Sequence, residues 1–348
     1  MPPALSERWR APSAATPVPV TGGDTVVTAD DGQVTGRDPL SGERRWHYAR
    51  ERPLCTVGEA FSRVHAVYAS ESGCSEVTQL DPATGRRTAQ RNGDAEHGTR
   101  LVGGDGHVTA TGDRLLNTWR SDLVLTLEYG RVPAPVNPDR QPRPNCTYST
   151  VDTHADRVAV IEDCPSDAGA RLTVLKAAGE EADEPEEEFS TVLPQESATL
   201  LAVSENAVAV ALPGTGQLVR YDHEGTRLGT HRLSVPADEL DRRRPGLVVP
   251  GSEGTENRYV FTGSHTLALD PDTLTPRWTA EGTLGPGTTF ANSYVVPIPR
   301  GLAVLDERDG RTLRTIAVDR RHRDAPVRLA SAGPVLLEQR GETLVALR

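Results

Sequence analysis

The chain has 348 residues, of which 36% are hydrophobic, and it contains 32 Gly and 27 Pro. A low hydrophobic content with many Gly and Pro favours numerous short strands joined by tight turns, and it argues against a helical bundle. The formal net charge is −11. Because a uniform excess of negative charge repels DNA, RNA and anionic lipid, we expect no nucleic-acid partner.

The sequence predicts no membrane span, because it holds no run of about 20 apolar residues. The first ten residues, MPPALSERWR, lack the apolar core of a signal peptide. An export signal or a membrane anchor would therefore have to precede residue 1. Lys176 is the only Lys among many Arg, which we interpret as the codon bias of a GC-rich genome.

A short phrase that ends one strand and turns into the next recurs along the chain. It follows an alternating apolar run, such as HTLALD at 265–270, and such alternation predicts a half-buried strand. In the form Asp-Pro-x-x-Gly, Asp accepts local backbone hydrogen bonds, Pro presets φ and Gly supplies a positive φ, so the phrase predicts a tight turn. In chain order the copies are RDPLSGERRW at 37–46, LDPATG at 80–85, YDHEGT at 221–226, LDPDTLTPRW at 269–278 and LDERDG at 305–310.

The spacing of these phrases predicts eight repeats. Each interval holds an innermost strand, a second strand, the strand that ends at the Asp, and a fourth strand after the Gly. The mean interval is about 44 residues, which is typical of the four-stranded blades of a β-propeller. The aligned Asp positions, three of which have lost the Asp, are Asp38, Asp81, Trp119, Lys176, Asp222, Asp270, Asp306 and Arg348.

The two ends of the chain complement each other in this register. Trp46 and Trp278 each lie eight residues after their Asp, and Trp9 counted back by eight falls on position 1. Arg348, the last residue, stands at an Asp position. The C-terminus would therefore supply three strands of a blade and the segment SERWR at 6–10 the fourth, so that the ring closes without an open edge.

The repeat and the ends together predict an all-β fold. We expect residues 1–348 to form a single domain, an eight-bladed β-propeller of four-stranded antiparallel blades, in which the N-terminal strand joins the last blade. A seven-bladed ring is the alternative count. A two-sheet sandwich is the alternative architecture, but it explains neither the period nor the complementary ends.

The pattern Asp-x-x-(Thr/Ser)-Gly-x-x-x-Trp, complete at 38–46, resembles the repeat of propellers related to pyrroloquinoline-quinone (PQQ) dehydrogenases. Those families include quinone-dependent alcohol dehydrogenases, and they also include non-catalytic envelope proteins such as the outer-membrane assembly lipoprotein of the BamB type. The resemblance therefore implies a fold but does not choose an activity. Together with the Arg bias, the chain looks like a propeller domain of an actinobacterial envelope protein.

The four cysteines fall into two similar pairs, Cys55 with Cys74 and Cys146 with Cys164. In each pair the first Cys opens an innermost strand and the second lies where the next strand ends, so the two should meet at one edge of a blade. Four free thiols are one alternative, and a zinc site is another, although no Cys-x-x-Cys or His-x-x-x-His spacing supports it. We predict two disulfides, and hence an oxidising, extracytoplasmic location.

Evidence for catalysis is weak in this sequence. A PQQ enzyme of the resembled type uses adjacent cysteines, a calcium shell of acidic and amide groups, and a catalytic Asp. This chain has no adjacent cysteines, and Trp46 and Trp278 are its only intact docking tryptophans. The segment DERDG at 306–310 occupies the turn of the repeat and lacks the ligand pattern of a calcium loop. We expect no catalytic residue, no metal site, no cofactor and no enzymatic activity.

Three segments depart from the repeat. The acidic insertion at 179–189 is expected to be a solvated, mobile loop. The links at 131–145 and 235–246 are rich in Pro and Arg, and they should leave the ring on the face that carries the cysteines. Solvated charges without a partner are the alternative, and the lack of interleaved aromatic residues argues against nucleic acid. The candidate interaction residues are Arg140, Arg143, Arg242, Arg243 and Arg244.

These observations predict a non-enzymatic protein-interaction scaffold of the bacterial cell envelope. Its partner would be a protein or an acidic envelope polymer that binds the links between blades. The alternative function is an enzyme or small-ligand binder that uses the central channel. A scaffold predicts small or apolar innermost residues, whereas a binder predicts converging Asp, Glu, Arg or His side chains with shifted pKa values.

Overall fold

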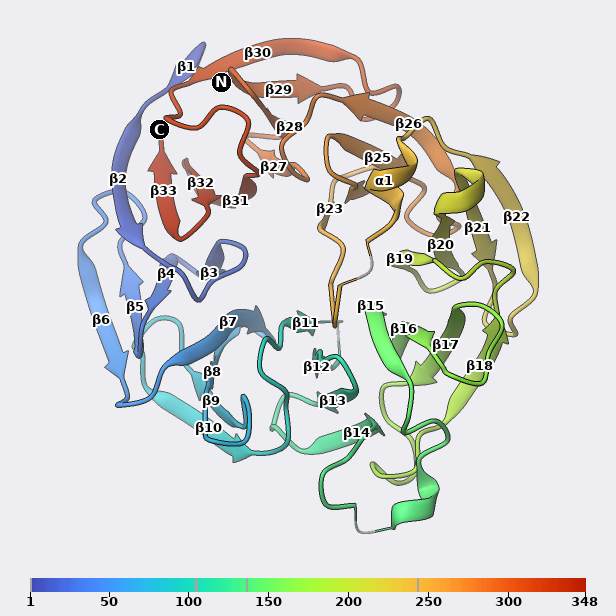
Figure 1. The fold of residues 1–348 in the computed structure, drawn as a ribbon. Helices are drawn as coiled ribbons and strands as arrows, with labels where there is room; N and C mark the ends of the chain where they lie inside the picture. The colour runs from blue at the N-terminus through green and yellow to red at the C-terminus, as the bar shows by residue number, and fades with distance from the viewer. Residues whose placement is uncertain (1, 104–105, 136, 243) are drawn as a thin grey trace.

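The computed structural model of the chain describes residues 2–103, 106–135, 137–242 and 244–348. Eight sheets radiate from a central axis as the blades of a propeller (Figure 1). Each blade has four antiparallel strands ordered from the innermost to the outermost, and blade 7 carries an additional parallel strand. The predicted eight-bladed, all-β fold is confirmed.

Blades are numbered here by the order of their innermost strands. Blade 1 contains β3 (Val20–Gly22), β4 (Thr25–Asp30), β5 (Gln33–Arg37) and β6 (Arg44–Ala49). Blade 2 contains β7 (Leu54–Ala60), β8 (Arg63–Tyr68), β9 (Glu76–Leu80) and β10 (Arg87–Asn92). Blade 3 contains β11 (Leu101–Gly103), β12 (Val108–Ala110), β13 (Leu115–Trp119) and β14 (Leu125–Gly130). Blade 4 contains β15 (Thr147–His154), β16 (Arg157–Asp163), β17 (Arg171–Lys176) and β18 (Glu187–Val192).

The second half of the ring repeats this order. Blade 5 contains β19 (Thr199–Val203), β20 (Val208–Leu212), β21 (Gln217–Tyr221) and β22 (Arg227–Arg232). Blade 6 contains β23 (Gly251–Glu253), β24 (Arg258–Phe261), β25 (His265–Leu269) and β26 (Pro276–Glu281). Blade 7 contains β27 (Thr288–Phe290), β28 (Ser293–Ile298), β29 (Gly301–Leu305), β30 (Thr312–Val318) and the added β1 (Ala4–Leu5). Blade 8 contains β31 (Arg328–Ala332), β32 (Val335–Arg340), β33 (Thr343–Leu347) and β2 (Glu7–Pro12). Three short helices lie outside the blades: η1 (Pro138–Arg140), η2 (Pro213–Thr215) and α1 (Ala237–Leu240).

The hydrophobic core lies between neighbouring blades, because the sheets pack face to face around the ring. Every residue of β20 is buried, and successive side chains point to opposite faces of the sheet. Val208 and Val210 therefore pack in the cluster shared with blade 4, while Ala209 and Ala211 pack in the cluster shared with blade 6. The alternation that predicted these strands thus assigns alternate residues to different junctions.

The tryptophan of the repeat fastens one blade to the turn of the next. Trp46 of β6 donates its Nε1–H to the carbonyl of Pro82, in the turn of blade 2, at 2.8 Å. Trp278 of β26 donates in the same way to the carbonyl of Glu307 in blade 7, at 2.9 Å. A Cβ on Gly85 would lie 2.4 Å from the Trp46 ring, and Gly85 has a φ of +68°. The turn glycine is therefore required both by the backbone and by the docked ring.

In blade 3 the predicted register is wrong by one residue, whereas in blade 4 it is right. Trp119 is the last residue of β13, and it is the next residue, Arg120, whose N–H bonds across the turn to the carbonyl of Val124. Lys176 donates its N–H to the carbonyl of Glu186, as Asp81 does to that of Arg86 in blade 2. In blade 2, the Asp81 carboxylate accepts backbone N–H bonds from Ala83 and Thr84 and so fixes where the turn begins. Blades 3 and 4 lack this Asp, and strand pairing alone sets their register.

The two ends of the chain meet as predicted. β2 pairs antiparallel with β33 in blade 8, and Trp9 lies opposite Ala346. Ser6 and Arg348 exchange two backbone hydrogen bonds of 3.0 Å. Trp9 donates its Nε1–H to the carbonyl of Pro39, in the turn of blade 1, at 2.9 Å. Trp9 is therefore a third docking tryptophan, and it joins blade 8 to blade 1.

The N-terminus also reaches a second blade. β1 pairs in parallel with β30, at the outer edge of blade 7, with Ala4 opposite Ala317 and Leu5 opposite Val318 (Figure 1). Leu5 is buried in the core cluster of blades 7 and 8. A strand of two residues is too short to show alternation, so no pattern in the sequence indicates this contact.

We expect Trp9→Ala to destabilise the ring, because it removes the docked indole and its bond to Pro39. The loss should be about 2–3 kcal/mol, below the range for a fully buried Trp since Trp9 is only half-buried. Urea unfolding would measure it. The control is Arg8→Ala, whose exposed side chain lies on the same strand. Equal stability of the two variants would contradict this account of closure.

Candidate interaction face

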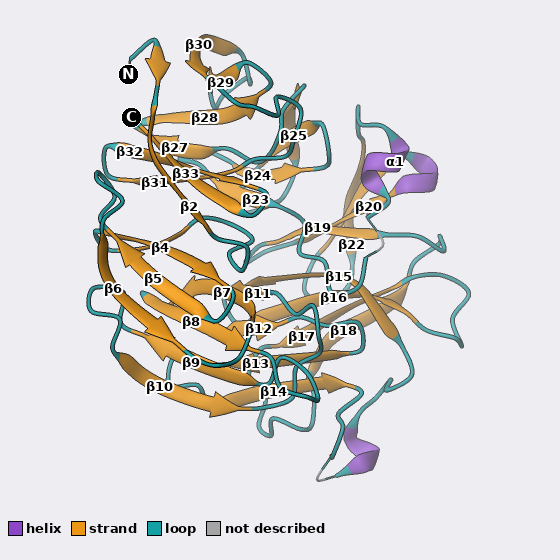
Figure 2. Cartoon of the chain, turned by 60° about the vertical axis from the view of Figure 1, so that its left-hand side comes forward, coloured by secondary structure: helices purple, strands orange, loops and turns teal. Residues whose placement is uncertain are grey.

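Two long links leave the ring on the face where the innermost strands begin, which we call the link face. Because every innermost strand starts there, this face also carries the turns between second and third strands. The first link, 131–146, joins β14 to β15, and the second link, 233–250, joins β22 to β23. Figure 2 shows their helices, η1 and α1, on the same side of the ring.

Both disulfides lie on the link face. Cys55 in β7 is bonded to Cys74, just before β9, and Cys146, just before β15, is bonded to Cys164, just after β16. Each bridge ties the start of an innermost strand to the turn after the second strand of the same blade. The sulfurs of Cys146 and Cys164 lie near the Glu162 carboxylate in a grouping that could suggest a metal site. Because both sulfurs are joined in a disulfide, they are not available as thiolate ligands.

The first link is anchored by a buried ion pair. Arg143 contacts the carboxylate of Glu162, which is fully buried in β16, at 3.2 Å. Arg143 also donates to the Tyr129 hydroxyl at 2.7 Å and pairs with Glu187 at 2.5 Å. Tyr129 and Thr173 donate to the same Glu162 carboxylate. Burial raises the pKa of Glu162, and Arg143 acts against that rise. Arg143 therefore holds the link to blades 3 and 4.

The acidic insertion packs against the first link. Arg140 lies 3.4 Å from Asp183 and 3.2 Å from Glu184. The backbone N–H of Glu128, on the outer strand of blade 3, donates to the carbonyl of Ala182 at 2.7 Å. The expectation of a solvated, mobile loop is therefore wrong for this part of the insertion, because it is tied by ion pairs to the link and by a backbone bond to the edge of blade 3.

The second link runs inward from blade 5 to blades 3 and 4. Gly246 donates its N–H to the carbonyl of Tyr148, and the carbonyl of Leu247 accepts from Val151 at 2.9 Å, so the link pairs with β15 of blade 4. Figure 1 shows this segment running inward from α1 toward β11 and β15. Gly246 has a φ of +56°, and a Cβ there would lie 2.9 Å from the backbone of Gly112 in blade 3. A link that begins on blade 5 thus reaches blades 3 and 4.

Glu239 anchors the helical part of the second link to blade 6. Its carboxylate accepts hydrogen bonds from the backbone and hydroxyl of Ser264 and from the hydroxyl of Thr262, at 2.6–2.9 Å. His265 Nδ1 lies 3.1 Å from the same carboxylate. Burial acts to raise the pKa of Glu239, but these hydrogen bonds outweigh it and lower the pKa to about 2. Glu239 is therefore ionised and fully engaged.

The structure separates the candidate interaction residues into two groups. Arg140 and Arg143 lie on the first link and form the ion pairs described above. Arg242 and Arg244 lie on the second link, where Arg242 is half-buried and Arg244 is exposed. Arg243 lies outside the described residues. Recognition of a partner by these arginines stays a prediction, and it now depends on the second link.

Buried Arg–Glu pairs are the site feature that the sequence analysis missed. Arg320, in the link before blade 8, lies 2.6 Å from the Glu338 carboxylate, and both side chains are buried. Glu162 and Glu338 both stand on the second strand of their blade, and each takes an Arg from the link that precedes it. The available signal was an acidic residue inside an apolar run, as in VAVIED at 158–163 and VLLEQR at 335–340.

The channel wall is not purely small and apolar. Asp152 of β15 accepts from Arg258 at 2.8 Å and from the backbone N–H of Val203 at 2.9 Å. Arg258 also donates to the carbonyl of Val203 at 2.7 Å. Burial raises the pKa of Asp152, and Arg258 acts against it. These polar groups satisfy one another at the junction of blades 4, 5 and 6, so they do not present free ligand groups.

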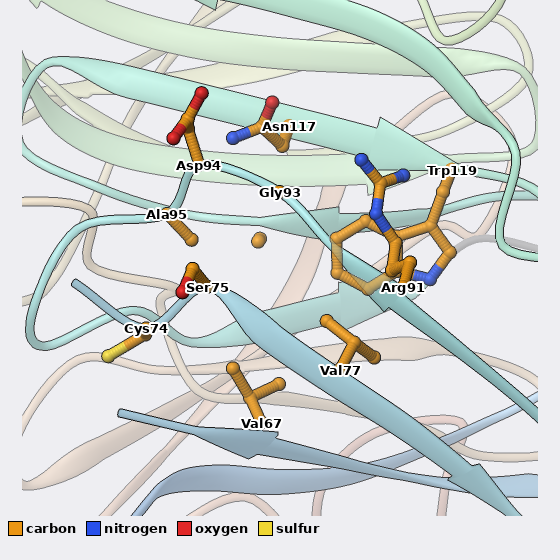
Figure 3. A pocket seen from close by; sticks show the side chains of 11 residues that line it. Val67, Cys74, Ser75, Val77, Arg91, Gly93, Asp94, Ala95, Asn117 and Trp119 are labelled. Carbon is orange, nitrogen blue, oxygen red and sulfur yellow. The ribbon is translucent and has the colours of Figure 1, made fainter. Parts of the chain in front are cut away.

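A small cavity between blades 2 and 3 adjoins the first disulfide at Cys74 (Figure 3). Its volume is about 10 Å³, far below the roughly 300 Å³ of a small-molecule pocket. Arg91 lies over the Trp119 ring at 5.5 Å on one side of it. The Asn117 amide beside it has no hydrogen-bond partner among the described residues. This cavity does not accommodate a substrate or a cofactor.

The sequence and the fold are similar to those of known propellers. Residues 6–124 match the family model described as outer membrane protein assembly factor BamB, which confirms the predicted resemblance for that part of the chain. No protein of curated function matches the sequence significantly. Among the described residues, no helix is long and apolar enough to cross a membrane.

Solved structures with this fold differ widely in what their titles name. BamB from Moraxella catarrhalis has a TM-score of 0.59 and 13% identity, with 99% of this chain and 100% of that chain covered. Quinohemoprotein alcohol dehydrogenase from Comamonas testosteroni has a TM-score of 0.57 and 12% identity, with 99% and 76% covered. Saccharomyces cerevisiae Sqt1 has a TM-score of 0.60 and 11% identity, with 99% and 98% covered. At these identities the similarity establishes the fold alone.

We expect peptide mapping without reductant to find two cross-linked peptides, Cys55–Cys74 and Cys146–Cys164, in protein matured outside the cytoplasm. Each bridge closes a loop of 18 or 19 residues, which stabilises the fold by about 3 kcal/mol in the chain-entropy model. The double variant Cys146→Ser/Cys164→Ser should therefore melt at a lower temperature. Four alkylatable thiols in the native exported protein would contradict the pairing.

We expect Arg143→Ala to lower the free energy of unfolding by about 3–5 kcal/mol, because it leaves the buried Glu162 carboxylate without its cation. Arg140→Ala is the matched control on the same link. Its partners are more exposed, so the loss should be about 0–1 kcal/mol. Urea unfolding compares the two, and equal losses would rule out a special anchoring role for Arg143.

Proposed function

We propose that this chain is a non-enzymatic scaffold of the bacterial cell envelope that binds a protein partner through its link face. The observation that carries the proposal is the path of the second link across the ring, where it pairs with β15. A ligand entering the channel from this face would meet that link. A protein partner that binds this surface would contact ordered loops held by ion pairs and disulfides.

Rigid links favour recognition because ordering loops on binding lowers affinity. The first link is fixed by Arg143, and the second by Glu239 and by the strand-like pairing of Leu247 with Thr150 of β15. Little conformational freedom would then be lost when a partner binds. The similarity of residues 6–124 to an outer membrane assembly factor supports a protein partner.

The two disulfides support an extracytoplasmic location, because such bonds persist in oxidising compartments and are rare in the cytosol. The predicted envelope location rests on this argument together with the family resemblance. An acidic envelope polymer is the other predicted partner. We favour a protein because the two links form shaped backbone structure and not only a run of positive charge.

A channel ligand is the second candidate, and the similarity in fold to a quinohemoprotein dehydrogenase favours it. On the face opposite the links, a cleft of about 320 Å³ is lined by His154, Glu205 and Arg258, among others. Calorimetry with PQQ and calcium separates the two functions. Binding at micromolar affinity would contradict the scaffold proposal.

Site-specific photo-crosslinking in cells of the source organism tests the scaffold directly. The cross-linker p-benzoylphenylalanine replaces Asp238, which is exposed on α1 of the link face. The matched control replaces Arg308, whose side chain is 82% exposed in a turn on the opposite face. We expect one discrete protein adduct from position 238 and none from position 308.

Three results would contradict the proposal. They are equal adducts from both positions, no adduct from either position, and an adduct with an acidic polymer in place of a protein.

A further inference from the structure

Two arginines without a carboxylate partner meet on the link face, at the junction of blades 6, 7 and 8. Arg328 is the first residue of β31, the innermost strand of blade 8. Arg242 follows α1 on the second link. Among the described residues, no carboxylate lies within ion-pair distance of either guanidinium, in contrast to the paired Arg143 and Arg320.

Arg328 is desolvated without being neutralised. Its guanidinium lies over the Phe261 ring at 5.6 Å, and its Nη1 atom is buried with no hydrogen-bond partner among the residues described. Burial, and after it the nearby charge of Arg242, lowers the pKa of Arg328 to about 10. The residue as a whole keeps some solvent exposure.

Two glycines show that the guanidinium groups of Arg242 and Arg328 lie against two neighbouring backbone segments. A Cβ on Gly263 would lie 2.7 Å from Arg242 Nη2, and a Cβ on Gly285 would lie 3.3 Å from Arg328 Nη1. The segments that carry these glycines are side by side, because Thr283 donates its N–H to the carbonyl of Ser264 at 3.0 Å. The absence of side chains at both positions leaves room for the two cations.

The nearest acidic group, Glu239, offsets one of the positive charges of Arg242, Arg328 and Arg244 and leaves the others uncompensated. Glu239 lies close enough to raise the pKa of Arg242 in part, but burial dominates and the pKa of Arg242 is lowered overall. The Glu239 carboxylate is already engaged by Ser264 and Thr262. Arg244, exposed on the same link, adds further positive charge. The junction is therefore locally cationic on a chain whose net charge is −11.

A buried, unpaired guanidinium is unfavourable in the free protein, since its lost hydration is not replaced by a counter-charge. An oxyanion supplied from outside would replace it and could accept hydrogen bonds from both arginines. We infer that the junction formed by Arg242, Arg328 and the Gly263 and Gly285 backbone is an oxyanion-binding site on the link face, and that it takes the carboxylate of an acidic protein partner.

This inference deepens the proposed function, because it names the group that the scaffold recognises. A carboxylate from a partner and a free inorganic anion share the chemistry of the site. The net acidity of the chain makes a cationic junction on the link face selective, because acidic groups are repelled by the rest of the surface. The experiment therefore separates the two sources and tests the site independently of any partner.

The test compares three full-length proteins: the wild type, Arg328→Met and Arg300→Met. Arg300→Met is the control, because Arg300 is an exposed arginine in a turn of the same face and forms no ion pair among the described residues. The melting temperature is measured in a chloride buffer and in one with inorganic phosphate at equal ionic strength. We expect phosphate near ten times its dissociation constant to raise the melting temperature of the wild type and of Arg300→Met by about 2 °C, and that of Arg328→Met by much less.

A second arm uses a fluorescent N-acetylated hexaglutamate peptide. Its affinity should fall roughly tenfold or more in Arg328→Met, as expected when a hydrogen bond to a charged group is lost, and phosphate should compete with it. In chloride alone, Arg328→Met should melt no lower than the wild type, because a buried unpaired charge has been removed.

A lower melting temperature of Arg328→Met in chloride would overturn the inference, because Arg328 would then be structural. An equal phosphate response in all three proteins would overturn it as well. Binding of phosphate without the peptide would support the anion site and overturn the protein carboxylate as its ligand. If Arg328→Met weakens binding of both phosphate and the peptide but photo-crosslinking finds no protein partner, the oxyanion site is supported and the proposed scaffold function is contradicted.

Discussion

A ring of radial sheets has no stable form until its first and last blades meet, and in this protein the antiparallel pairing of β2 with β33 makes that contact. Without it, the outer edge of β33 would expose a row of unpaired backbone groups. The pairing joins residues from opposite ends of the chain, so it requires all eight blades to be in place. Trp9 and the short β1 extend the same N-terminal segment onto blades 1 and 7. The position of every link depends on this closure, because each link joins two blades of the ring.

Arginines from the links meet buried glutamates of the blades that follow them. Arg143 with Glu162 and Arg320 with Glu338 share this arrangement, and Glu76, which is half-buried, pairs with Arg50 and Arg52 from the link before blade 2. A buried carboxylate that lost its partner would be strongly destabilising, so the pair fixes where the link lies even if its net contribution to stability is small. The links are thus part of the folded framework and do not behave as free loops.

The same rule makes Arg328 stand out. It is desolvated like Arg320, yet no acidic residue in the described part of the chain forms an ion pair with it. On a chain with many more acidic than basic residues, a carboxylate partner would be easy to supply by substitution. The unpaired charge lies on the face where the second link runs inward to blades 3 and 4. Surface recognition of an acidic group fits both features, whereas chemistry inside the channel uses neither.

The sequence by itself determined the architecture and the covalent framework. The turns that begin with Asp-Pro at Asp38, Asp81 and Asp270 mark strand ends through local hydrogen bonds, and the spacing of Trp9, Trp46 and Trp278 agreed with the blade count and the closure. The cysteine pairs followed from their repeated place within a blade. All of these signals are local or periodic, so they can be read along the chain. Where the turn Asp is missing, the inferred register was right at Lys176 but slipped by one residue at Trp119.

Only the tertiary structure decided what the links do. In the sequence, Arg140 and Arg143 cannot be told apart from Arg242 and Arg244. The structure holds Arg140 and Arg143 in ion pairs with residues distant along the chain, and no local pattern encodes those partners. The crossing of the ring by the second link depends on backbone contacts of Gly246 and Leu247 with blades 3 and 4. The isolation of Arg328 depends on which groups surround it in space. Such long-range relations between charges and backbone exist only once the ring has closed, because the closed ring alone brings these segments together.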